Sequence, residues 1–168
     1  MRTELFCYDD LTDVQRQQLE RIEVLPEQQL YSGDIQSALS SLLDRPTPAV
    51  RGFALLVERR PAGFLLLKRG ALLPPWADKD SATLHALQID FRMQGRGLGK
   101  LCLHALPEVV RRIWPDVTQL MLSVDADNEA ARGLYLGLGW VDTGNGYRGR
   151  VGYERRLVLD LRTEANEL

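Results

Sequence analysis

The first part of the chain alternates between short apolar runs and polar stretches with helical spacing. Residues 4–8 predict a short opening strand. Thr12 and Gln15 have the hydroxyl-then-amide spacing of a capping box, which predicts a polar helix ending near Glu23. Pro26 is expected to close that unit. Residues 32–43 carry apolar side chains at every third or fourth position, which is typical of a second helix.

The middle of the chain contains two continuous apolar runs, at 52–57 and 63–67. The polar segment 58–62 between them has the length of a hairpin connection, so the runs predict two buried antiparallel strands. A fourth strand is expected over 82–91. The glycine-rich segment 95–99 then leads the chain into a helix.

The second half repeats this alternation of helix and strand. The helix is expected to kink or restart at Pro107 and to end near Trp114. Residues 118–124 predict a further strand, and Asp127 is expected to cap a helix over 128–138. The final strands are expected at 140–142 and 155–161, with a frayed tail at 162–168. These elements give about seven strands and about four helices in a single domain over residues 1–161.

Composition and charge exclude several classes of function. A chain of 168 residues with 45% hydrophobic residues is long enough for one domain with its own core. The net charge of -2 and the pI near 5.7 argue against nucleic acid or an anionic membrane as partner. Cys7 and Cys102 lie in apolar runs without metal-ligand spacing, which predicts buried thiols, no metal and a reducing compartment. Without a long apolar leader, a cytoplasmic protein is expected.

The segment Gln94–Lys100 places three glycines between a strand and a helix. Backbone N–H groups and the helix dipole at such a junction suit a phosphate, although a glycine-rich turn with no ligand explains the same residues. A Walker loop would need a glycine at position 94 and Ser or Thr at 101. A dinucleotide fingerprint starting at Gly95 would need a glycine at 100, so both nucleotide patterns fail.

The surrounding sequence resembles the GNAT superfamily of N-acetyltransferases. Gln94-x-x-Gly97-x-Gly99 is similar to that family's Gln/Arg-x-x-Gly-x-Gly/Ala loop. Residues 128–140 are similar to its Asn-x-x-Ala-x-x-Leu-Tyr-x-x-x-Gly-Phe segment, with Ala131, Leu134 and Tyr135 in register and Trp140 in place of Phe. The close resemblance covers residues 52–143. It implies an α/β (α+β) acyl-CoA N-acyltransferase fold with a mixed, mostly antiparallel sheet.

The resemblance also implies acetyl-CoA as co-substrate. Backbone N–H groups of the glycine loop would hold its pyrophosphate, and the strand around 87–89 would expose backbone to the pantetheine amides. For Arg96 and Lys100, contact with phosphate and a solvated surface position are both open. The residues expected to bind acetyl-CoA are Leu87, Gln88, Ile89, Gln94, Gly95, Arg96, Gly97, Leu98, Gly99, Lys100, Asn128 and Tyr135.

Two residues are candidates for proton transfer. Tyr135 matches the family position that protonates the departing CoA sulfur, and Asn128 lies two helical turns earlier on the same face. A core tyrosine is the alternative for Tyr135. His85 stands where many relatives have a glutamate base. Strict alternation puts His85 on the face of Leu87 and Ile89, so a packed histidine is equally consistent with the sequence.

The acceptor is expected to be a primary amine of a small molecule, polyamine or peptide. Glu27, Tyr31 and Asp34 lie in a segment that loosely resembles polyamine acetyltransferases, although helix capping explains the two acids equally well. Since neither cysteine lies in a motif, direct attack in a ternary complex is the hypothesis. A non-catalytic CoA sensor and an enzyme for longer acyl-CoA are the alternatives. A homodimer through the last strands and Trp140 is also considered.

Overall fold

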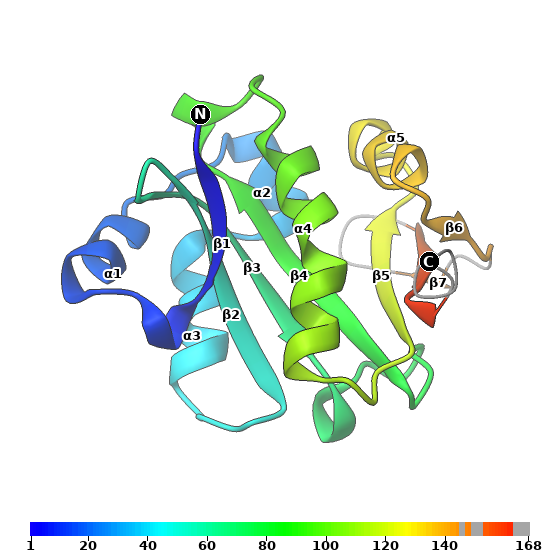
Figure 1. The fold of residues 1–168 in the computed structure, drawn as a ribbon. Coiled ribbons are helices and arrows are strands. Elements are labelled where there is room, and N and C mark those ends of the chain that lie inside the picture. Colours follow the sequence, from blue (N-terminus) through cyan, green and yellow to red (C-terminus); the bar gives the residue numbers. More distant parts are fainter. Residues whose placement is uncertain (145–146, 149–152, 163–168) are drawn as a thin grey trace.

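One mixed sheet carries the whole fold (Figure 1). The computed structural model describes residues 1–144, 147–148 and 153–162, and for 147–148 the backbone only. The strands are β1 (Thr3–Cys7), β2 (Val50–Val57), β3 (Arg60–Lys68), β4 (Ser81–Ile89), β5 (Gln119–Asp125), β6 (Val141–Asp142), β7 (Tyr147–Arg148) and β8 (Tyr153–Asp160). They form an eight-stranded sheet in the order β1-β2-β3-β4-β5-β8-β6, with β7 paired to β8. Of the tail expected to fray, residues 163–168 lie outside the described residues.

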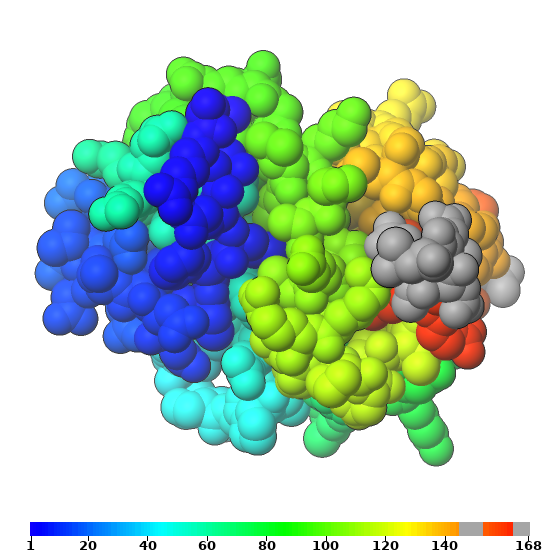
Figure 2. Space-filling model, viewed as in Figure 1, coloured from blue at the N-terminus to red at the C-terminus, as the bar shows by residue number. Residues whose placement is uncertain are grey.

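Five α-helices among the described residues cover the two faces of the sheet. They are α1 (Asp13–Leu19), α2 (Pro26–Ser32), α3 (Ile35–Leu43), α4 (Leu98–Ile113) and α5 (Glu129–Gly137). On one face, α1 and α3 cover a smaller core that includes Leu19, Leu39 and Phe64. On the other, α4 and α5 cover a larger core that includes Leu106 and Leu120. Figure 2 shows β1, in blue, lying against α4, in green, on that second face.

The N-terminal helices differ from the expected pair in number and in ends. The Thr12–Gln15 capping box is present, and both reciprocal hydrogen bonds form. However, α1 ends at Leu19, four residues before the predicted end. Pro26 begins α2 rather than only closing α1, because the first helical position needs no N–H donor. Gly33, with φ +72°, then separates α2 from α3, so three helices replace the expected two.

The expected antiparallel hairpin is formed by β2 and β3. Its turn is shorter than the predicted 58–62 connection: Val57 pairs with Arg60, and only Glu58 and Arg59 lie between them. Both have positive φ, +48° and +69°, as a two-residue turn that matches the strand twist requires.

A bulge in β4 reverses the side-chain alternation that the sequence predicts. Ala86 and Leu87 together lie opposite the single residue Leu65 of β3, and Ala86 has a left-handed φ of +56°. His85 pairs with Leu66, whose side chain lies in the smaller core, whereas Leu87 packs against the larger core. The prediction that His85 shares a face with Leu87 and Ile89 is therefore wrong.

The pairing of β4 with β5 is short. It is the parallel pair of the sheet and joins Ser81–Thr83 to Gln119–Met121 only. Beyond Thr83 the two strands diverge (Figure 1). The N–H and C=O groups of 84–89 on the edge that faces β5 therefore have no partner strand there, and a ligand can reach them.

The later elements follow the predicted order with three corrections. α4 runs through Pro107 as one helix, so of the expected kink or restart the restart does not occur, and buried residues on both sides of Pro107 hold the helix against the sheet. Asn128, not Asp127, caps α5, since its Oδ1 accepts from the N–H of Ala131 at 3.3 Å. Trp140 is only 3% exposed and so offers no surface for a dimer.

In the part of the chain that is described, no helix is both long and apolar enough to cross a membrane.

Candidate active site

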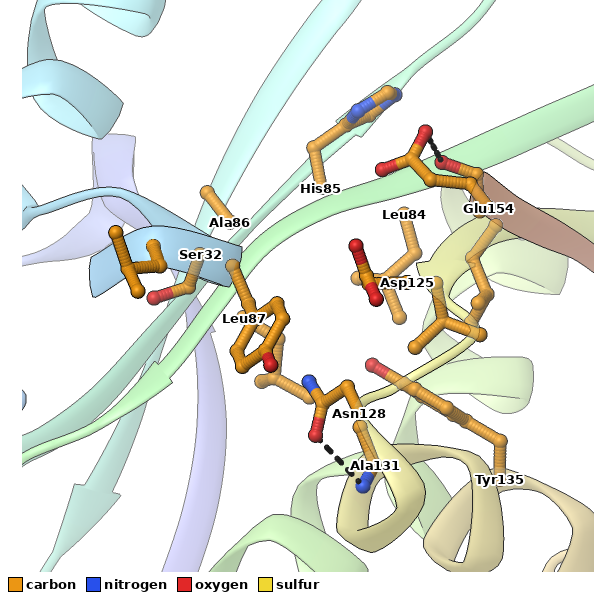
Figure 3. Close-up of a pocket in the computed structure, with 15 residues that line it drawn as sticks. Ser32, Leu84, His85, Ala86, Leu87, Asp125, Asn128, Ala131, Tyr135 and Glu154 are labelled. Atoms are coloured by element: carbon orange, nitrogen blue, oxygen red, sulfur yellow. Dashed lines mark hydrogen bonds between the residues drawn. The ribbon is translucent and has the colours of Figure 1, made fainter. Parts of the chain in front are cut away.

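A cavity of about 340 Å³ lies where β4 and β5 separate (Figure 3). We call it the β4–β5 cavity. It is lined by 30–32 of α2, 84–87 of β4, 122–125 of β5, Asn128, Ala131 and Tyr135 of α5 and its cap, and Glu154 of β8. Because α2 and α5 cover opposite faces of the sheet, the cavity passes between the two faces. Two reactants can therefore meet in it from opposite sides.

Tyr135 reaches the β4–β5 cavity from α5, as its position in the motif predicts. Its ring packs edge-on against Trp140, with centroids 5.5 Å apart and planes at 61°. The residue is 8% exposed. Burial, with a smaller contribution from the neighbouring Cys102 thiol, raises the pKa of the Tyr135 hydroxyl above its ordinary value of 10.0. The hydroxyl therefore keeps its proton at neutral pH and is available as a proton donor.

Asn128 lines the same end of the β4–β5 cavity. Its Oδ1 caps α5, so the amide orientation is set by the helix (Figure 3). Because Oδ1 of Asn128 accepts the hydrogen bond from the Ala131 N–H, the side-chain amide is fixed at the start of α5. There it lines the cavity, where its NH₂ group can contact a ligand.

His85 lines the other end of the β4–β5 cavity, on the side of α2. One ring nitrogen, Nε2, lies 2.7 Å from the hydroxyl oxygen of Thr83. Burial first, and then the charge of Lys68, lower the pKa of His85 from 6.5 to about 4. The imidazole is therefore neutral at physiological pH. A neutral ring can accept a proton, and its hydrogen bond to Thr83 limits which nitrogen is free to do so.

Two carboxylates in the β4–β5 cavity were not anticipated from the sequence. Asp125 ends β5 and is 6% exposed, and Glu154 lies opposite it on β8. The hydroxyl of Ser123 donates to Oε2 of Glu154 at 3.3 Å. The sequence could have indicated Asp125 as a candidate, because it lies between the end of a predicted strand and the start of a predicted helix, where binding sites often form. Glu154 lies in no motif, and only the pairing of β8 with β5 brings it here.

The glycine loop leads directly into α4. Gly95 and Gly97 have φ of +79° and +76°, and Gly97 is the N-cap of this 16-residue helix. No heavy atom lies within 4 Å of a Cβ added at either glycine, so the left-handed backbone is what requires glycine there. Arg96 and Lys100 are exposed. Free N–H groups, a helix dipole and two cations fit a pyrophosphate at this loop.

Gln94 holds this loop against two other elements. Its amide Nε2 donates to the carbonyl of Ile89 at 2.8 Å, and its amide lies 3.0 Å from that of Gln28 in α2. Gln28 also accepts from the N–H of Leu25 at 3.0 Å, which caps α2. The glycine loop is therefore linked to the helix whose Tyr31 lines the β4–β5 cavity.

The structure separates the three residues expected to bind the acceptor. Tyr31 lines the β4–β5 cavity, and Glu27 and Asp34 do not. Glu27 is exposed in the first turn of α2. Asp34 caps α3 by accepting from the N–H of Ser37 at 2.8 Å, and this hydrogen bond lowers the pKa of Asp34. The carbonyl of Asp34 also accepts from the buried side chain of Gln88.

Neither cysteine lies in the β4–β5 cavity lining. Cys102 is buried in the larger core, where burial raises its thiol pKa to about 12, and Cys7 is half-buried in β1. The expectation of a packed thiol is met at Cys102.

Comparisons with known proteins agree on one family. The family model described as "Acetyltransferase (GNAT) family" matches residues 10–140. No curated protein matches the sequence. Among solved structures, spermidine N-acetyltransferase from Vibrio cholerae in complex with CoA and spermine is similar, with 18% identity, a TM-score of 0.66 and 98% of each chain covered.

Two further structures share the fold. The aminoglycoside acetyltransferase AAC(6')-Ib in complex with coenzyme A has 19% identity and a TM-score of 0.71, and 98% of each chain is covered. An acetyltransferase from Thermus thermophilus has 23% identity and a TM-score of 0.60, with 95% of this chain and 97% of that chain covered.

Proposed function

Because this chain belongs to the acetyltransferase (GNAT) family, we propose that it transfers the acetyl group of acetyl-CoA to a primary amine by direct attack in a ternary complex. The family, the fold class and the class of acetyl-CoA-dependent N-acetyltransferases, as expected from the sequence, are confirmed by that membership. The observation that carries the proposal is the β4–β5 cavity. Tyr135, as a proton donor, and the part of β4 that has no partner strand meet there, and β4 leads on to the glycine loop at the start of α4.

The chain's own residues provide a continuous binding path for acetyl-CoA. The N–H groups of 94–99 and the start of α4 would hold the pyrophosphate, assisted by Arg96 and Lys100. The unpaired edge of β4 at 87–89 would hydrogen-bond the pantetheine amides as a partner strand does. Asn128 and Tyr135 would bind the end that carries the acetyl group. When bound there, acetyl-CoA supplies an activated thioester.

Proton transfer is assigned to Tyr135 and His85. Tyr135 donates a proton to the departing sulfur, since its raised pKa keeps the hydroxyl protonated. His85, neutral and on the α2 side, accepts a proton from the amine as it attacks. The two side chains lie toward opposite ends of the β4–β5 cavity (Figure 3), so the amine and the thioester lie between them.

The acceptor would enter from the side of α2, where Tyr31 and Ser32 form the wall. Structural neighbours bind spermine or carry the name of aminoglycoside acetyltransferases, which supports an amine acceptor here. Of the three residues expected to bind the acceptor, Tyr31 is proposed to touch it. We further propose that residues 1–161 act as one domain, since the cofactor path and the acceptor wall share one sheet.

Thermal unfolding with acetyl-CoA, CoA, NAD and ATP tests this proposal before an acceptor is known. A ligand at 100 times its Kd adds about 2.7 kcal/mol to the free energy of unfolding. Stabilisation by acetyl-CoA and CoA alone supports the proposal, and CoA release on adding amines then tests catalysis. No shift at millimolar acetyl-CoA would refute the cofactor assignment. Binding without release for any amine indicates a sensor, and faster release from longer acyl-CoA indicates a different acyl donor.

A further inference from the structure

Asp125 and Glu154 form a like-charged pair across two strands. They are direct partners in the antiparallel register of β5 and β8 and both line the β4–β5 cavity. Directly opposite residues have Cβ atoms about 5 Å apart on the same face of the sheet. Two negative charges at such positions repel each other and destabilise the pair. A cation placed between them would remove this repulsion.

The protein itself does not neutralise the pair. Among the described residues, no lysine, arginine or histidine nitrogen lies within 4.0 Å of either carboxylate. Arg156 is on the same face of β8, but its guanidinium donates to the carbonyl of Trp76. His85 is neutral, and Lys68 lies beyond it on β3.

Asp125 is built to present its carboxylate to the β4–β5 cavity. Its Oδ1 accepts from the N–H of Asp127 at 2.8 Å, which fixes the side chain. Within the described part of the chain, Oδ2 accepts no hydrogen bond from the protein. Figure 3 shows the Asp125 carboxylate among the side chains that line the cavity. A carboxylate that is 6% exposed and has one oxygen without a protein partner can accept a hydrogen bond from a ligand in the cavity.

We propose that Asp125 and Glu154 bind a second, protonated amino group of the acceptor, so that the enzyme selects diamines and longer polyamines. This inference rests on the proposed acetyl transfer. The attacking amine must be neutral, whereas two carboxylates favour the ammonium form of whatever amine they hold. The group bound between them is therefore not the nucleophile. The amine that reacts is a different nitrogen of the same molecule.

The decisive comparison uses acceptors that differ in one group. 1,4-Diaminobutane carries a second ammonium, 4-amino-1-butanol a neutral hydroxyl of similar size, and n-butylamine a methyl group. With wild type, kcat/KM for CoA release is expected to be roughly 10- to 100-fold higher for the diamine than for the amino alcohol, as a hydrogen bond to a charged group implies.

Asp125→Asn and Glu154→Gln remove one charge each and keep the oxygens that accept from Asp127 and Ser123. Each is expected to reduce the preference for the diamine over 4-amino-1-butanol and n-butylamine at least about fivefold. Their melting temperatures should equal or exceed that of wild type, because repulsion is relieved. Glu129→Gln is the matched control, since this exposed acid of α5 lies outside the cavity lining.

A binding measurement makes the test independent of turnover. With CoA saturating, 1,4-diaminobutane should raise the melting temperature of wild type and of Glu129→Gln more than 4-amino-1-butanol does, and neither cavity variant should show this difference. Equal effects of the two compounds on wild type, or an unchanged preference in both variants, overturns the proposal. Absence of stabilisation by acetyl-CoA is a different result, because it rejects the proposed function instead.

Discussion

Replacing Tyr135 by phenylalanine tests the proton donor with the smallest possible change. The substitution removes one oxygen and keeps the ring that packs against Trp140 at 5.5 Å. Among the described residues, no protein group is hydrogen-bonded to that hydroxyl, so its removal leaves no protein donor or acceptor without a partner. The melting temperature of the variant should therefore equal or slightly exceed that of wild type.

The effect on catalysis should be large, because general acid catalysis contributes about 10²- to 10⁴-fold. At about 1.36 kcal/mol for each factor of ten, this loss corresponds to roughly 2.7–5.4 kcal/mol in the activation free energy. The affinity for acetyl-CoA should change little, since most of the proposed contacts lie along β4 and the glycine loop. Because the pKa of Tyr135 is raised above 10.0, the loss should be the same at every pH up to that value.

The assay is CoA release under saturating acetyl-CoA and amine, with affinity measured separately by thermal shift. Tyr153→Phe is the matched control, because this tyrosine of β8 is 66% exposed and lies outside the β4–β5 cavity lining. A decrease in kcat of less than about threefold for Tyr135→Phe would refute its role as the acid. In that case Tyr135 would be a core tyrosine, the alternative that the sequence left open.

Three further predictions concern the loop, the histidine and the link to α2. Gly97→Ala forces alanine to a φ of +76°, so it should cost about 1–2 kcal/mol and weaken acetyl-CoA binding, whereas Gly137→Ala in α5 should raise the melting temperature. The unfolded chain binds a proton at His85 below pH 6.5 and the folded chain only near 4. Wild type should therefore lose stability relative to His85→Gln as the pH falls through that window, and an unchanged difference would contradict the lowered pKa. Gln28→Ala removes the amide contact to Gln94 and should raise KM for the amine more than for acetyl-CoA, which initial rates can resolve.

The proposed cofactor side of the site could be located from the sequence because its signals are local. The residues from Gln94 to Gly99 are contiguous, and the positions of Asn128 and Tyr135 follow from helix periodicity once α5 is recognised. Each of these two features therefore depends only on residues that lie near one another in the sequence. The structure accordingly places Asn128 and Tyr135 at the β4–β5 cavity and the glycine loop at the start of α4.

The acceptor side could not be predicted in the same way because it depends on long-range pairing. Glu154 enters the site only through its register with Asp125 on a strand 29 positions earlier. Periodicity also failed at His85, because the left-handed φ of Ala86 carries no sequence signal when the residue is not glycine. For Asp34 the sequence left two roles open, since capping and ligand binding both favour a carboxylate there, and the structure shows it capping α3.

The bulge in β4 and the short β4–β5 pairing together shape the β4–β5 cavity, the proposed reaction site. Without the extra residue at Ala86, strict alternation would place His85 and Leu87 on the same face, so His85 could not lie on the side of the smaller core while Leu87 packs against the larger one. If β4 and β5 continued to pair beyond Thr83, the strand edge would be closed and no passage would join the two faces of the sheet. The bulge therefore lets His85, the proposed base, lie on the α2 side of the cavity, while the divergence of β4 and β5 lets Tyr135 line it from the side of α5. In the proposed reaction, both irregularities are needed for an amine and a thioester to meet between β4 and β5.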